Sequence, residues 1–132
     1  MLMKTALICM ALNIYHEARD QPLAGQLAVA QVVVNRTLHK DYPSSVCSVV
    51  KQKHQFSWLW DDISDKPYEK EAWKLSQQIA KSVLAGRTTE IVEGATHYHA
   101  TSVTPGWSKR LERVVKIDKH IFYRSPIDTK EK

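Results

Sequence analysis

Apolar and polar positions follow a helical period over the first two thirds of the chain. Residues 7–18 carry an apolar stripe at three- and four-residue spacing, which predicts an amphipathic helix. The polar turn at residues 20–22 ends this helix, and a second apolar stripe predicts another helix from Pro22 to about Leu38. A short amphipathic piece over residues 46–51 is interpreted as a further helix.

The pattern changes from helical to extended near the middle of the second half. A last helix is predicted from near Pro67 to a cap at Gly86. Beyond it the apolar period becomes two, so residues 95–100 and 113–124 predict strands separated by an irregular loop at residues 103–107. A small sheet must pack against the helices, which predicts an α+β fold. The last helix has an apolar stripe that is assigned to the core: Tyr68, Ala72, Leu75, Ile79 and Val83.

Composition adds a domain count and an electrostatic preference. The chain has 132 residues and 43% hydrophobic content, which predicts one domain over residues 1–132 with a frayed tail at 125–132. The net charge of +5 favours a polyanionic partner. Nucleic acid is not expected as that partner, because the basic residues are dispersed. Membrane insertion is not expected either, because no apolar stretch is long enough to span a bilayer.

The two cysteines and the apolar N-terminus bear on the compartment. Cys9 and Cys47 are too few to define a disulfide framework in a chain of this size, and Cys9 is expected to be a small core residue. The apolar run over residues 5–12 follows a single lysine but lacks a small-residue cleavage site. We therefore expect this run to be part of the fold, and synthesis in the cytoplasm without a signal peptide.

Glu17 is the main candidate for chemistry. It lies where the first predicted helix ends, so its carboxylate faces the negative end of the helix dipole. That position and a nearby apolar wall would both raise its pKa, as general-acid catalysis on an acetal requires. The alternative is an exposed glutamate that forms an ion pair with Arg19.

Two other patterns leave function open. His97 and His99 alternate along a predicted strand, as a zinc pair could, but without a spaced partner motif they are more typical of ordinary histidines. No metal or cofactor is therefore expected. The aromatic and polar residues 55–62 have the composition of a binding loop, or equally of a connector anchored in the core.

Several spaced blocks together resemble the SleB/CwlJ family of cell-wall hydrolases. They occur in order along nearly the whole chain: Tyr15-His16-Glu17-Ala18-Arg19, residues 25–36, Gln55-Phe56-Ser57, Gly94-Ala95-Thr96-His97-Tyr98-His99, and His120-Ile121-Phe122-Tyr123-Arg124. The resemblance implies a lysozyme-like fold that is mainly helical with a small antiparallel β-sheet. It also implies cleavage of the glycan strands of peptidoglycan, with the family's catalytic glutamate at Glu17.

The same resemblance implies the substrate-binding residues. Gln55 and Ser57 match a block that lines the sugar-binding groove, and Tyr98 with His97 and His99 matches a block on its sheet side. The compact, basic chain without further regions looks like a phage endolysin. It would act as a monomer on the cell wall of the host.

The predicted function is cleavage of the β-1,4 bond between N-acetylmuramic acid and N-acetylglucosamine, with Glu17 as general acid and base. A muramidase needs a second carboxylate, for which Glu93 and the pair Asp61 and Asp62 are candidates. A lytic transglycosylase does not, because the sugar's own 6-hydroxyl attacks, and this route is slightly favoured. The alternatives are a zinc-dependent peptidoglycan amidase that uses His97 and His99, and a non-catalytic binder of anionic polymers.

Overall fold

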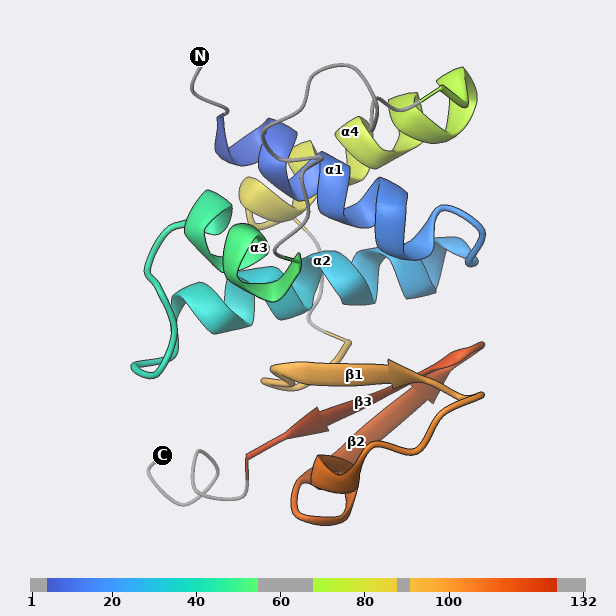
Figure 1. Cartoon of the computed structure of the whole chain (residues 1–132). Helices are drawn as coiled ribbons and strands as arrows, with labels where there is room; N and C mark the ends of the chain where they lie inside the picture. The colour runs from blue at the N-terminus through green and yellow to red at the C-terminus, as the bar shows by residue number, and fades with distance from the viewer. Residues whose placement is uncertain (1–4, 55–67, 88–90, 126–132) are drawn as a thin grey trace.

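The structure is a computed structural model that describes residues 5–54, 68–87 and 91–125. The described α-helices gather on one side of the sheet, and the short 3-10 helix lies beside the sheet (Figure 1). This arrangement confirms the predicted α+β class. The elements follow in the order α1 (Ala6–Ala18), α2 (Leu23–Thr37), α3 (Val46–His54), α4 (Lys70–Leu84), β1 (His97–Ala100), the 3-10 helix η2 (Gly106–Lys109), β2 (Glu112–Ile117) and β3 (His120–Arg124).

Helix α1 is the centre of the helical layer. The Thr5 hydroxyl accepts a hydrogen bond from the Ile8 N–H at 3.2 Å and so caps the start of the helix. Met10 and Ile14 are fully buried, and α1 contacts α2, α3 and α4. Because α1 is packed on several sides, its C-terminal turn is held in a fixed place. No helix in the described ranges has both the length and the apolar character needed to cross a bilayer.

Helix α4 ends as predicted but begins later. Gly86 has a φ of 71°, its N–H donates to the Val83 carbonyl at 3.0 Å, and the Arg87 N–H donates to the Ser82 carbonyl at 3.1 Å. This pair of bonds is a glycine C-cap. At the other end, Tyr68 precedes the helix and is 76% exposed. The assignment of Tyr68 to the core is therefore wrong, because the helical period did not extend to it.

A disulfide joins Cys9 in α1 to Cys47 in α3, across a sequence separation of 38 residues. This bond was not predicted from the sequence, where two cysteines were considered too few to define a disulfide framework. Cys9 is nevertheless buried, as predicted. The pairing was not visible in the sequence because it depends on α1 and α3 lying side by side in the fold.

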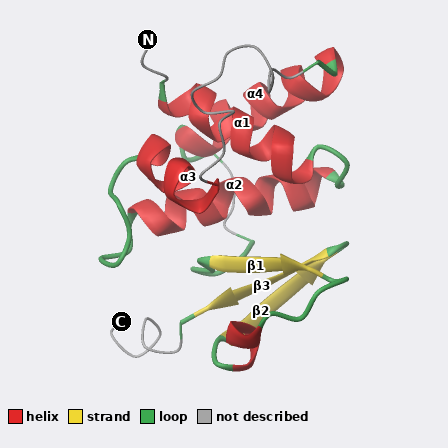
Figure 2. Ribbon diagram, in the orientation of Figure 1, coloured by secondary structure: helices red, strands yellow, loops and turns green. Residues whose placement is uncertain are grey.

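The sheet is antiparallel with strand order β1-β3-β2 (Figure 2). The stretch predicted as extended over residues 113–124 lies in a hairpin, with a turn at Asp118, whose φ is 49°. Phe122 of β3 is fully buried in a cluster with Val29 and Val32 of α2. The sheet therefore packs on the helices, as predicted, and its helix-facing side carries Tyr98, which pairs with Phe122.

Candidate active site

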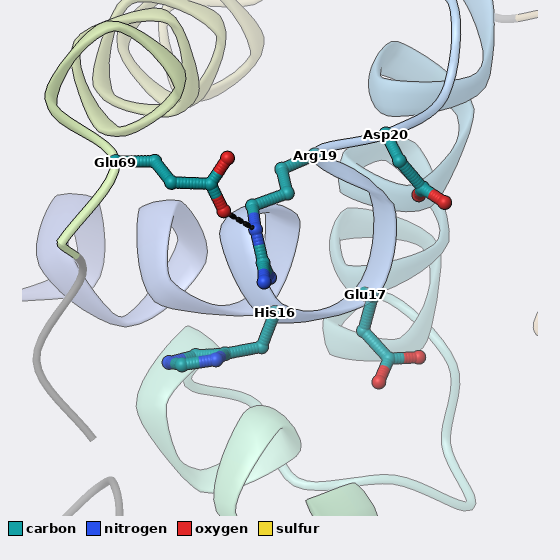
Figure 3. Close-up of a pocket in the computed structure, with 5 residues that line it drawn as sticks. All are labelled: His16, Glu17, Arg19, Asp20 and Glu69. Atoms are coloured by element: carbon teal, nitrogen blue, oxygen red, sulfur yellow. Dashed lines mark hydrogen bonds and ion pairs between the residues drawn. The ribbon is translucent and has the colours of Figure 1, made fainter. Parts of the chain in front are cut away.

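A polar pocket of about 470 Å³ lies at the C-terminal end of α1 (Figure 3). It contains three carboxylates together with a guanidinium and an imidazole: its lining residues are His16, Glu17, Arg19, Asp20 and Glu69. Glu17 occupies the last turn of α1, where the sequence placed it. A pocket lined by several polar and charged side chains is suited to binding and cleaving a polar substrate.

Tyr98 holds the Glu17 carboxylate from the sheet side. Its hydroxyl donates a hydrogen bond to Glu17 Oε1 at 2.7 Å, between residues 81 positions apart. Burial, and next the charge of Glu17, raise the pKa of Tyr98 well above its ordinary value near 10. Tyr98 therefore keeps its proton at neutral pH and remains a hydrogen-bond donor. Donation to a carboxylate favours its charged form, which opposes the helix-end effect expected for Glu17.

Two bonds from α2 fix the backbone just before β1, and so position Tyr98. The Asn35 side-chain amide donates to the Ala95 carbonyl at 2.8 Å, and Arg36 Nε donates to the Thr96 carbonyl at 2.7 Å. Both donors are side chains on the last turns of α2. Strand β1 is thus tied to the helical layer by hydrogen bonds as well as by apolar packing.

Arg19 and Glu69, which both line the pocket, are paired with each other. Arg19 forms an ion pair with Glu69, and its Nη1 donates to the Tyr15 carbonyl at 3.1 Å. The hydrogen bond to Glu69 is the main cause that raises the pKa of Arg19. Arg19 is therefore paired with Glu69, whereas the sequence-based alternative paired it with Glu17. Figure 3 shows Arg19 directed toward Glu69.

His97 and His99 lie on the face of β1 opposite to Tyr98, because side chains alternate along a strand. The His97 ring is 5.0 Å from the Trp107 ring, measured between centroids, and His99 Nε2 is 2.9 Å from the Tyr123 hydroxyl. Neither histidine is among the residues that line the pocket. Within the described ranges, no cluster of three or more histidine, cysteine or carboxylate side chains could hold a metal ion.

The remaining predicted residues add no support for the site. Gln55, Ser57, Asp61 and Asp62 lie outside the described residues. Glu93 is exposed and is not among the residues that line the pocket; its carbonyl accepts from Arg124 Nη1 at 2.8 Å.

Four pocket residues were not predicted as site residues: His16, Arg19, Asp20 and Glu69. Arg19 was considered only as an ion-pair partner of Glu17. His16 and Asp20 flank Glu17 in the sequence, so proximity could have suggested them. Glu69 could not be found in this way, because it reaches the pocket from the start of α4. Only the packing of α4 against α1 brings it there.

Comparison with known proteins gives the family. A family model described as "Cell Wall Hydrolase" matches residues 20–123. The chain belongs to this cell wall hydrolase family. Spore cortex-lytic enzymes are similar to it: the enzyme of Halalkalibacterium halodurans is 32% identical over 86% of the chain, and that of Bacillus subtilis is 27% identical over 86%. The chain spans 33% and 35% of the lengths of these two relatives.

Two solved structures share the fold of this chain. The catalytic domain of the germination-specific lytic transglycosylase SleB from Bacillus anthracis matches with a TM-score of 0.73 and 26% identity, covering 93% of this chain and 97% of that one. The catalytic domain of the Bacillus cereus SleB protein matches with a TM-score of 0.67 and 28% identity, covering 90% and 89%. The resemblance to the SleB/CwlJ family and the lysozyme-like fold class are thereby confirmed. Glu17 precedes the residues that match the family model, so that match does not bear on its role.

Proposed function

We propose that this protein cleaves the β-1,4 bond between N-acetylmuramic acid and N-acetylglucosamine in peptidoglycan, with Glu17 as general acid and base. The observation that carries the proposal is the Glu17 carboxyl group, held by Tyr98 at 2.7 Å on the wall of a polar pocket. The similarity to spore cortex-lytic enzymes and to a lytic transglycosylase catalytic domain supports this choice of substrate.

Glu17 first donates its proton to the glycosidic oxygen as the bond to the anomeric carbon breaks and positive charge develops on the sugar. The resulting Glu17 carboxylate then takes the proton of the muramic acid 6-hydroxyl, whose oxygen bonds to the anomeric carbon. The products are a 1,6-anhydro sugar and a new chain end that carries the proton. Tyr98 binds Oε1 in this scheme, so the transferred proton is expected on the other carboxyl oxygen.

Hydrolysis is the second candidate, because Asp20 and Glu69 line the same pocket as Glu17. An inverting or retaining hydrolase needs a second carboxylate to activate water or to act as nucleophile. Glu69 is already engaged in an ion pair with Arg19. Asp20 is the carboxylate that would serve a muramidase mechanism, and it replaces Glu93 as our candidate for that role.

The remaining predictions form part of the same proposal. We treat residues 1–132 as one catalytic domain that acts as a monomer on cell-wall glycan strands, and its origin from a phage stays a prediction. Gln55, Ser57, His97 and His99 stay predicted substrate contacts. Tyr98 was also predicted as a substrate contact. Its hydrogen bond to Glu17 supports instead a role in positioning that carboxyl group.

Mass spectrometry of purified peptidoglycan after digestion tests the proposal. We expect 1,6-anhydro-muropeptides from the wild-type protein and none from Glu17→Gln. Reducing-end products would instead favour the muramidase with Asp20. Release of stem peptides from intact glycan would show an amidase, and binding without any product would show a polymer binder. Either of the last two results would overturn the proposal.

A further inference from the structure

Tyr68 is an aromatic side chain left in solvent at the edge of the pocket. It is 76% exposed, and it is the only aromatic among the strongly exposed large apolar residues of the described ranges. It directly precedes Glu69, which lines the pocket. A single exposed tyrosine is common on protein surfaces. The contacts that hold this one make it unusual.

The backbone of Tyr68 is fixed by the helix that carries Glu17. The Tyr15 hydroxyl accepts hydrogen bonds from the N–H of Tyr68 at 3.1 Å and from the N–H of Glu69 at 3.0 Å. Tyr15 is itself buried in α1, two residues before Glu17. Tyr68 is therefore held in a constant position relative to the reacting carboxyl group.

The Tyr68 ring is also supported by a cation. The guanidinium of Arg19 lies 4.6 Å from the centre of the Tyr15 ring and 6.0 Å from the centre of the Tyr68 ring. Such contacts between guanidinium and aromatic rings are attractive. The ion pair with Glu69 limits the movement of Arg19. The exposed Tyr68 ring is thus held next to Arg19 and Glu69, two hydrogen-bonding side chains that line the pocket.

We propose that Tyr68, supported by Arg19 and Tyr15, is a platform on which one sugar ring of the glycan strand stacks, so that the neighbouring glycosidic bond is positioned at Glu17. A tyrosine ring presents an apolar face and a polar edge, which fits the C–H face and hydroxyl groups of a sugar. Arg19, Asp20 and Glu69 supply donors and acceptors for the sugar's amide and hydroxyl groups. This inference rests on the proposed function and adds a substrate-positioning subsite to it.

Substitution of Tyr68 separates ring stacking from structural support. Tyr68→Ala removes the ring but keeps the backbone N–H that Tyr15 accepts, so the melting temperature should not change. In the inactive Glu17→Gln background, co-sedimentation should show that Tyr68→Ala lowers affinity for purified peptidoglycan by about 5- to 30-fold. In the active protein the same change should raise KM by a similar factor and leave kcat within about twofold.

Two kinds of control make the test specific. Tyr68→Phe and Tyr68→Trp keep a ring and should retain affinity within about threefold of the parent. Leu38→Ala removes a side chain of similar exposure, 81%, at the C-cap of α2, and should leave both affinity and KM unchanged.

The outcomes distinguish the platform from the proposed function. If the wild-type protein cleaves peptidoglycan but Tyr68→Ala changes neither the affinity for peptidoglycan nor KM, the platform is refuted and the proposed function stands. If Tyr68→Ala lowers the melting temperature without changing affinity, Tyr68 is a structural residue and the platform is again refuted. If the wild-type protein forms no product, the proposed function fails, whereas a ring-dependent affinity in the Glu17→Gln background would still support the platform.

Discussion

Tyr98→Phe removes a single oxygen atom, the one that donates to Glu17 at 2.7 Å. The ring itself should stay in place, because its centroid lies 5.4 Å from that of Phe122 and 5.2 Å from that of His120. A hydrogen bond to a charged group contributes about 1.5–3 kcal/mol. If the whole of this contribution positions Glu17 in the transition state, kcat should fall about 10- to 150-fold. KM should change little, because the substrate contacts remain.

The pH–activity profile provides a second measurement on the same variant. Loss of the Tyr98 donor makes the charged form of Glu17 less favourable, so the carboxyl group should keep its proton to higher pH. Activity that depends on protonated Glu17 should then be lost at a higher pH in Tyr98→Phe than in the wild type. Initial rates on solubilised glycan strands across a pH series measure both effects.

Tyr123→Phe is the matched control. It also removes one tyrosine hydroxyl from the sheet, but that hydroxyl lies 2.9 Å from His99 Nε2, on the other side of the sheet. It should cost about 1 kcal/mol of stability and leave kcat unchanged. An unchanged kcat and pH profile in a folded Tyr98→Phe protein would refute the positioning of Glu17 by Tyr98. An equal loss of activity in both variants would mean that the effect comes from the sheet as a whole.

Three further predictions follow from the same structure. Glu17→Gln should retain the fold and binding to peptidoglycan but lose about two to four orders of magnitude in cleavage rate; near-wild-type turnover would remove Glu17 from the mechanism. Reduction of the Cys9–Cys47 disulfide should lower the free energy of unfolding by about 4 kcal/mol, because the unfolded chain regains the entropy of a loop with a 38-residue separation. Urea denaturation with and without reductant measures this difference. The variant with both cysteines replaced by alanine is the control, and its stability should not change with reductant. Because the pKa of Tyr98 is raised in the fold, the stability that this tyrosine contributes is fully present below about pH 10, its unfolded value. That stability should be lost as the pH rises further, so the wild type should lose more stability than Tyr98→Phe between pH 9 and pH 11 in urea denaturation, and parallel losses would contradict the shift.

The sequence by itself determined the helices and named the candidate catalytic residue. The apolar stripes of α1, α2 and α4 are local patterns, and each one specifies a buried face whatever covers it. The Gly86 cap was predictable for the same reason, since a left-handed residue after a helix depends on neighbouring bonds only. Glu17 was predicted as the catalytic acid because it ends a predicted helix within a block that resembles a known family. Its neighbours His16 and Asp20 were close enough in sequence to be found with it.

Only the tertiary structure decided which residues meet Glu17. Tyr98 donates to Glu17 from 81 positions away in the sequence. In the same pocket, Arg19 pairs with Glu69 across a separation of 50 positions. Periodicity shows which face of an element is buried but not which other element covers that face. The Cys9–Cys47 bond depended in the same way on the contact between α1 and α3. Tyr68 had the spacing of a core residue, but α4 begins after it, so its ring was left in solvent beside the pocket.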